Sequence, residues 1–319
     1  MLGVGVQTWG TEVGALRGYW EAIDELGFTR IAYGDGLGHW TLDGWTTLGA
    51  LATLTRRARL GPAVTYAFDA AAHHPSWLAK RAATLDHLSG GRAELRLGIG
   101  AADAETARIW TGYGIAYPDP RVRIAMIEEA VTVVRALWTG EPVDHPGPHW
   151  RLRGATLAPK PVQDPGPPVW IAAMGPMALA AAARCADGWE ASYLTPAAFG
   201  TRWAVVHDHL TAHGRPVASF RRSVELDVIM ASATDLAGAR EAFRRVRGIP
   251  PDHPLLETAL VGDGATIAAR IAEYAAAGVT DLMLGFADFP ALGMLERFAR
   301  EVLPSFARPV TRRRMGPSA

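Results

Sequence analysis

Cysteine and lysine are scarce in this chain of 319 residues. Cys185 is the only cysteine, which excludes a disulfide framework and a metal site built from several thiolates. It lies in an alanine-rich helical pattern, so we expect a buried structural thiol. Lysine occurs only at Lys80 and Lys160, and the 32 basic residues balance the 32 acidic ones. The summed charge therefore gives no attraction to nucleic acid or to an anionic membrane.

Long uncharged apolar runs are also missing. No segment reaches the ~18 residues of a membrane-spanning helix, and the chain does not begin with a charged region and a cleavable apolar stretch. We therefore expect a cytoplasmic protein without a membrane or nucleic-acid partner. Residues 1–310 are predicted to form a single domain, and residues 311–319, with their arginine cluster, a flexible tail.

Short β-rich runs alternate with longer segments of helical period along the chain. Eight strands are predicted, at residues 2–8, 29–33, 60–65, 93–98, 168–172, 187–191, 223–229 and 280–285. Helices are predicted at residues 12–26, 44–58, 75–88, 121–138, 176–186, 197–213, 234–247 with 264–277, and 290–302. Eight strand and helix units predict an α/β fold, a parallel sheet closed into a (β/α)8 TIM barrel.

Two segments interrupt this alternation. Residues 139–167, after the fourth helix, are too long and too rich in proline and glycine for an ordinary connection. Within them, residues 149–152 are expected to form a small extra strand or a lid. Residues 248–262 split the seventh unit. Such insertions can cover the mouth of a barrel or only pack against it, and both alternatives stay open.

Glycines flank the predicted strand 93–98 on both sides. Gly90 or Gly91 can adopt the left-handed conformation that ends the helix before the strand. Gly98 and Gly100 lie at the carboxyl end of the strand, where barrel active sites are built and where a bare backbone lets a flat ligand approach. The glycines therefore indicate a ligand site at this end of the barrel.

Three segments point to a family: LAKRAATLDHLSGGRAELRLGIG (78–100), ALWTGEPVDHPGPHWRL (136–152) and PKPVQDPGPPVWIAAMGPMALAAAARCADGW (159–189). In this order they resemble the luciferase-like monooxygenase family, which includes FMN-dependent monooxygenases and enzymes that use the deazaflavin coenzyme F420. The resemblance implies a barrel with a reduced flavin or deazaflavin across its mouth, and a homodimer.

The branch of the family is indicated by the ends of two strands. F420-using members often have Asp-His after the second strand and Trp four residues later; this chain has Asp35 and Trp40 but lacks that histidine. Members that oxidise alcohols use the histidine and a glutamate after the fourth strand, where this chain has Ala101 and Ala102. The resemblance therefore favours the F420 branch and argues against alcohol oxidation.

A flavin or deazaflavin ring needs small side chains beneath it and apolar neighbours around it. Ala63, Val64, Gly98 and Gly100 suit this ring floor, and the resemblance implies a cis peptide bond between the first two. For the phosphate of the cofactor tail, the resemblance implies the helix start after the fifth strand, where backbone donors can hold an anion. The predicted cofactor-binding residues are Trp40, Ala63, Val64, Gly98, Gly100, Ala173, Met174, Gly175, Pro176, Glu190 and Ser192.

Proton transfer to the substrate is assigned to side chains at strand ends. His39 is the first choice because an imidazole titrates near neutral pH, and Asp35 and Tyr66 complete the predicted catalytic set. His74 precedes a proline at a helix start, where capping or packing is the alternative role. Further candidates are Gln7, Trp9, His73, Asp103 and Glu105. No metal site is predicted, because no histidine pair has ligand spacing supported by a third residue.

The sequence thus leads to a functional hypothesis. We expect a reductase that transfers a hydride from reduced F420 to a C=C, C=N or C=O bond of a small, hydrophobic substrate, such as a secondary metabolite. One alternative is an FMN-dependent monooxygenase that uses reduced FMN, and another is a non-catalytic flavin-binding relative. The family resemblance leaves the substrate itself open.

Overall fold

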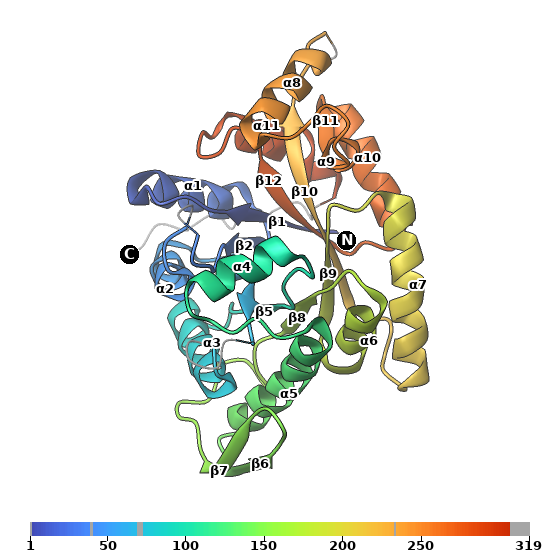
Figure 1. Ribbon diagram of the computed structural model, residues 1–319. Helices are drawn as coiled ribbons and strands as arrows, with labels where there is room; N and C mark the ends of the chain where they lie inside the picture. The colour runs from blue at the N-terminus through green and yellow to red at the C-terminus, as the bar shows by residue number, and fades with distance from the viewer. Residues whose placement is uncertain (1, 39–40, 69–72, 233, 307–319) are drawn as a thin grey trace, which may run out of the picture.

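The computed structural model describes residues 2–38, 41–68, 73–232 and 234–306. Their central element is a parallel sheet with the strand order β3-β2-β1-β12-β10-β9-β8-β5-β4 (Figure 1). A parallel bridge between Leu60 and Ala93 joins its two ends. The strands are β1 (Gly3–Thr8), β2 (Arg30–Tyr33), β3 (Arg59–Pro62), β4 (Thr65–Tyr66), β5 (Leu95–Gly98), β8 (Val169–Ala172), β9 (Gly188–Ser192), β10 (Arg221–Met230) and β12 (Asp281–Phe286). The predicted TIM barrel is confirmed.

Helices surround the barrel (Figure 1). They are α1 (Val13–Leu26), α2 (Gly44–Leu54), α3 (Pro75–Ser89), α4 (Ala104–Gly112), α5 (Pro120–Trp138), α6 (Pro176–Cys185), α7 (Pro196–Ala212), α8 (Leu236–Arg247), α9 (Leu255–Thr258), α10 (Gly264–Ala276) and α11 (Gly293–Glu301), with a 3-10 turn, η1 (Leu303–Ser305). Gly90 ends α3 with a φ of 65°, as the sequence predicts. Within the described ranges, no helix has the length and apolar character to cross a membrane.

The third predicted strand is interrupted in its middle. β3 ends at Pro62, β4 begins at Thr65, and the peptide bond between Ala63 and Val64 is cis. The cis bond that the family resemblance implies is therefore confirmed. β3 pairs with β2, whereas β4 pairs with β5, so the two halves together complete one strand position of the barrel.

The insertion after α5 forms a hairpin of β6 (Val143–Pro146) and β7 (Arg151–Ala155), which lies beyond α5 at the lower end of the view in Figure 1. Glu129 of α5 accepts a hydrogen bond from the backbone N–H of Trp150 at 2.8 Å and lies 3.0 Å from Nε2 of His145. Of the two alternatives for this insertion, packing is the one observed. The apolar stripe of the helix pattern at residues 121–138 leaves Glu129 on another face, and the hairpin packs against that face.

The second insertion adds structure beside β10. β11 (Leu260–Gly262) pairs with β10 in parallel, and Phe243 of α8 packs on Ile229 and Ala259. At the end of α8, Arg247 forms an ion pair with Asp227 of β10. The helix is thereby tied to the carboxyl end of a barrel strand.

Charged side chains fill the barrel interior below the strand ends. Glu94 is 2% exposed. Its carboxylate forms ion pairs with Nε of Arg30 at 2.9 Å and with Nη1 of Arg96 at 3.1 Å. The ring of Trp170 lies between the two guanidinium groups, at 4.9 and 4.7 Å. These mutual charge and cation–π contacts offset the cost of burying the ions. The barrel is therefore a packed core, and a ligand at its mouth lies above this network.

Candidate active site

An apolar cavity of about 550 Å³ lies at the carboxyl ends of β4, β5, β8 and β9. The loop after β5, the start of α5 and the start of α6 complete its walls. The hydroxyl groups of Tyr66 and Ser192 are the polar side-chain groups that line it. A concave apolar space with few polar groups is the usual form of a cofactor or substrate site.

The cavity brings together residues that the sequence had placed in one site. They are Val64, Tyr66, Gly98, Gly100, Ala173, Met174, Gly175, Pro176 and Ser192. Ala63 precedes this wall without lining it, whereas His39 and Trp40 lie outside the described residues. The roles of all these residues in binding or catalysis stay predictions.

Gly98 is required by the packing of its neighbours. A Cβ atom on Gly98 would lie 2.3 Å from Cγ2 of Val64 and 3.0 Å from Cε1 of Tyr66. Val64 and Tyr66 both border the cavity, and they can pack over the end of β5 because Gly98 has no side chain. Gly100 has a φ of +80°, which a side chain would strain. The two glycines therefore shape the wall of the cavity.

The amino terminus of α6 borders another part of the cavity. Gly175 is the N-cap and supplies no side-chain hydrogen bond, Pro176 has no N–H, and the N–H of Leu179 bonds to the carbonyl of Gly175 at 2.9 Å. The N–H groups of Met177 and Ala178 thus remain at the helix end, where the helix dipole favours an anion. A Cβ on Gly175 would meet open space, so an incoming group can approach this end closely.

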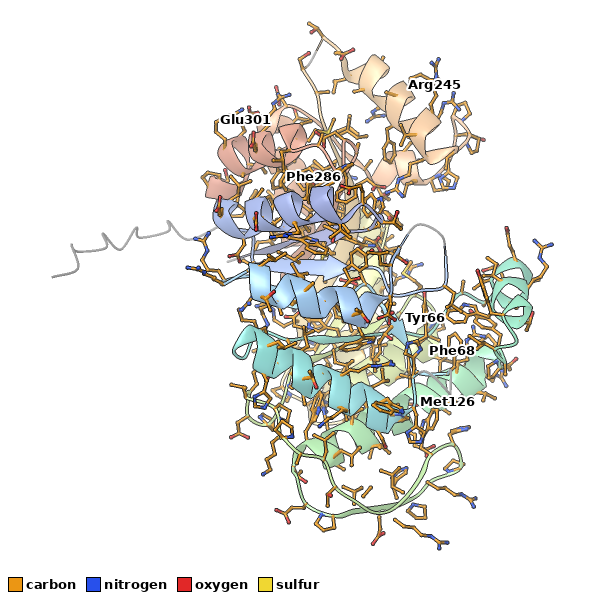
Figure 2. All side chains as sticks on the ribbon, turned by 90° about the vertical axis from the view of Figure 1, so that its left-hand side faces the viewer. Tyr66, Phe68, Met126, Arg245, Phe286 and Glu301 are labelled. Carbon is orange, nitrogen blue, oxygen red and sulfur yellow. The ribbon has the colours of Figure 1, made fainter. Side chains whose placement is uncertain are left out.

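Tyr66 is the ionisable side chain of the cavity wall. Burial raises the pKa of its phenol, and the neighbouring Tyr117, Asp35 and Glu225 raise it further. The ring packs on Phe68 at 5.4 Å, and the two lie side by side in Figure 2. Within the described part of the chain the hydroxyl forms no hydrogen bond. Tyr66 therefore presents a protonated hydroxyl that can donate a hydrogen bond to a ligand.

Asp35 lies behind the cavity wall rather than on it. Its side chain is 6% exposed, and its Oδ2 is 3.6 Å from Nε2 of His73. Burial raises the pKa of Asp35, while a hydrogen bond from Thr65 and the charge of His73 oppose this shift. A Cβ on Gly44 would lie 2.6 Å from the Asp35 carboxyl, so α2 can begin against it only with glycine there. Asp35 thus acts on the cavity through its neighbours.

Glu190 lies one layer below the cavity. Its carboxylate pairs with Arg96 and accepts a hydrogen bond from Oγ of Ser223 at 3.1 Å. Side chains two residues apart on a strand share a face, so Ser192 points the same way and reaches the cavity while Glu190 joins the interior ions. The sequence placed Glu190 on the correct strand but could not give its depth in the barrel.

Other predicted candidates have structural roles at element ends. Nδ1 of His74 accepts the N–H of Ser76 at 3.1 Å and caps α3, which confirms the alternative of capping. Asp103 caps α4 by accepting the N–H of Thr106 at 2.7 Å. The Trp9 ring packs on Phe289 at 4.9 Å. None of these residues lines the cavity.

Arg123 shapes the cavity and was missed by the sequence analysis. It is 2% exposed, and its guanidinium donates to the carbonyls of Ile99 at 2.8 Å and Ala101 at 2.7 Å. The Tyr117 ring lies 3.9 Å below the guanidinium carbon. The apolar stripe of the helix pattern at residues 121–138 leaves Arg123 on another face, but the side chain is buried because these carbonyls accept hydrogen bonds from its guanidinium. Its spacing of four residues from Ile127 is the signal that could have revealed it.

A second polar group faces the mouth from β9 and β10 and was also missed. The hydroxyl of Tyr193 donates to Oε1 of Glu225 at 2.9 Å. Two residues further along β10, Asp227 pairs with Arg247. Burial raises the pKa of Asp227 to about 6. In the described ranges, no cluster of histidine, cysteine and acidic residues has the form of a metal site.

Comparison with known proteins identifies relatives of this chain. The luciferase-like monooxygenase family model matches residues 3–257. The phthiodiolone/phenolphthiodiolone dimycocerosates ketoreductase of Mycobacterium sp. (strain JLS) is 35% identical over 199 residues, which are 61% of this chain and 50% of the relative. The chain thus spans about half the length of this curated relative.

Solved structures at low identity have the same fold. The coenzyme F420-dependent tetrahydromethanopterin reductase of Methanopyrus kandleri matches with a TM-score of 0.82 and 20% identity, over 96% of this chain and 99% of that one. The oxygenating constituent of 3,6-diketocamphane monooxygenase of Pseudomonas putida, in complex with FMN, matches with a TM-score of 0.75 and 19% identity, over 97% and 100%. Proteins with this barrel include users of either cofactor.

Proposed function

Since the chain belongs to the luciferase-like monooxygenase family, we propose that it is a reductase that takes a hydride from reduced F420 and reduces a C=C, C=N or C=O bond. The observation that carries this proposal is the apolar cavity at the barrel mouth, in which Tyr66 is the ionisable lining residue. Such a wall suits a hydride transfer that needs a dry site and one proton donor.

The residues of the cavity fit a flavin-like cofactor. Val64, Gly98 and Gly100 would face the ring, because they leave an apolar surface without long side chains. The N–H groups of Met177 and Ala178 would hold the phosphate of the tail, since a helix start with an open glycine before it accepts an anion. The bound cofactor would supply the hydride.

The chain's own residues orient the substrate and move the proton. The apolar walls exclude water from the reacting bond, and the Tyr66 hydroxyl donates a proton to the oxygen or nitrogen of a C=O or C=N bond as the hydride reaches its carbon, or to the second carbon of a C=C bond. The charge of Asp35 and burial keep Tyr66 protonated at neutral pH. Tyr66 then recovers its proton from solvent at the open side of the mouth.

An FMN-dependent monooxygenase is the second candidate function. The similarity to a structure in complex with FMN supports it, because the same barrel mouth can take that cofactor. An oxygen-using site is expected to have a basic side chain beside the ring, and in the described part of the chain no basic residue lines the cavity. The F420 reductase is therefore the better supported proposal.

A turnover experiment separates the two candidates. Reduced F420 is mixed with the protein and a panel of enones, imines and ketones under nitrogen, and F420 formation is followed by its visible absorbance. The proposal predicts acceptor-dependent oxidation without oxygen. Oxygen consumption with reduced FMN, and no turnover under nitrogen, would replace it by the monooxygenase. A protein that binds either cofactor without any turnover would be the non-catalytic relative.

We also propose that the protein is a homodimer that pairs through α2 and α3. α3 leaves two large apolar side chains in solvent, with Trp77 58% and Leu88 50% exposed. Both line a shallow groove of about 210 Å³ between the helices, next to Gly49. A second copy of the chain would cover this apolar face, as exposed patches of this kind favour association.

A further inference from the structure

Glu225 is a carboxylate at the barrel mouth that enters the proposed hydride transfer only through its charge, which disfavours ionisation of Tyr66. It lies opposite Ser192 in the register of β10 with β9. Residues in register on neighbouring parallel strands face the same side of the sheet, and Ser192 lines the cavity. Glu225 therefore faces the barrel mouth one strand beyond the cavity wall.

Among the described residues, Glu225 has no cation in direct contact with its carboxylate. Its carboxylate accepts the Tyr193 hydroxyl at 2.9 Å, and among the described residues it forms no ion pair within 4.0 Å. Arg247, the cation whose charge it feels, is paired with Asp227. The side chain of Asp227 is 2% exposed, and its Oδ2 is buried without a hydrogen-bond partner. Two carboxyl groups on this face of β10 thus interact with one guanidinium, which is in contact with Asp227.

Aromatic rings border the same space. The negative charge of Glu225 is one cause of the raised pKa of Tyr66 in the cavity wall. A Cβ on Gly285 would lie 3.2 Å from Oδ1 of Asp227 and 3.3 Å from Cη2 of Trp9. The indole of Trp9 therefore lies beside Asp227, and the guanidinium carbon of Arg247 lies 5.7 Å from the centroid of its ring. Carboxylates next to electron-rich rings attract an organic cation through charge and cation–π contacts.

We infer that Glu225 binds a protonated amine on the substrate and thereby selects substrates with a basic nitrogen. The inference rests on the proposed function, because it adds a recognition group to the same mouth. The ammonium would lie at Glu225 and against the rings, while the reducible bond lies at Tyr66. An amine satisfies the carboxylate, which a neutral substrate of equal size would leave unpaired and partly desolvated.

The test compares benzylamine with benzyl alcohol, which match in size and differ in charge at neutral pH. Each is titrated by calorimetry into the F420-loaded protein after F420 binding itself has been measured. We expect the amine to bind at least about tenfold more tightly, as a charged hydrogen bond requires. Glu225→Gln, which keeps an acceptor for Tyr193, should abolish this preference and leave the affinities for F420 and benzyl alcohol unchanged. Glu225→Asp should retain part of it.

Glu25→Gln is the matched control, because it removes the same charge from an exposed position in α1. It should bind the amine like the wild type. An equal preference in wild type and Glu225→Gln, or no preference in the wild type, would overturn the inference while leaving the reductase proposal intact. Failure of F420 to bind would instead overturn the reductase proposal and the inference with it.

Discussion

At the scale of single residues, the proposed hydride transfer depends on one hydroxyl, that of Tyr66, held in its protonated form. Burial raises its pKa, and the charges of Asp35 and Glu225 make loss of the proton still less favourable. Among the described residues that line the cavity, Ser192 has the only other side-chain hydroxyl. A group that stays protonated, faces the cavity and has no partner in the described chain is suited to assist an acceptor.

Tyr66→Phe tests this role directly. Removal of the hydroxyl should lower kcat by about 100-fold or more, the usual contribution of a positioned acid. The affinity for F420 and the melting temperature should change little, because the hydroxyl bonds to no described residue. Steady-state kinetics with reduced F420 and a thermal melt measure both. Tyr113→Phe is the control, since that hydroxyl donates to the Leu37 carbonyl outside the cavity; equal kcat values for the two variants would contradict the role.

Asp227 gives a prediction about pH. Burial raises its pKa from 3.8 to about 6, so the native state binds this proton more tightly than the unfolded chain. Its contribution to the free energy of unfolding therefore falls as pH rises between these two values, and is constant above and below them. Asp227→Asn should lack this dependence in urea titrations at several pH values. Asp252→Asn, which removes an exposed acid, should follow the wild type; parallel curves for all three proteins would refute the prediction.

At the scale of elements, α5 is joined to the cavity wall by Arg123. The guanidinium holds the carbonyls of Ile99 and Ala101, which belong to the loop that lines the cavity. Helix and loop therefore move together. This contact gives a buried charge its partners and at the same time fixes the wall against which a cofactor would lie.

Arg123→Met should lower both stability and cofactor affinity. Loss of the charged hydrogen bonds to buried carbonyls should cost about 2–3 kcal/mol in the free energy of unfolding. The freed loop should weaken F420 binding by about tenfold or more, measured by fluorescence titration. Arg121→Met changes an exposed arginine on the same helix and should alter neither quantity. A destabilised Arg123→Met variant with unchanged F420 affinity would show that the loop does not contact the cofactor.

Most of the elements that the sequence predicted have several buried residues. The eight predicted strands were found, the third one interrupted at Ala63 and Val64, and the predicted helices were found to within a few residues. α4, which was missed, buries Trp110 alone, whereas α8 was predicted although it buries Phe243 alone. Glu190 was assigned to the cofactor because strand position shows which face a side chain takes and not which layer. Arg123, Glu225 and Asp227 were missed because their partners are distant in sequence and their charges suggest an exposed position.

At the scale of the whole molecule, association is predicted from the exposed face of α2 and α3. Trp77→Ser should weaken the proposed homodimer by about tenfold or more, because a large aromatic residue at the centre of an interface carries much of its energy. Val246→Ser removes an apolar side chain that is 77% exposed on α8 and should not affect association. Sedimentation equilibrium at micromolar concentration measures both, and a monomeric wild type would contradict the proposal.

The central claim is that the cavity at the barrel mouth binds F420, and equilibrium titration of the apoprotein with F420 and with FMN tests it most directly. Tryptophan fluorescence quenching should show selective F420 binding. F420 binding should be lost in Gly175→Leu, because the leucine side chain would enter the open space at the start of α6. F420 binding should be kept in the control Gly18→Leu, which adds the same side chain in open space on α1. Selective FMN binding, or F420 binding unaffected by Gly175→Leu, would contradict the account.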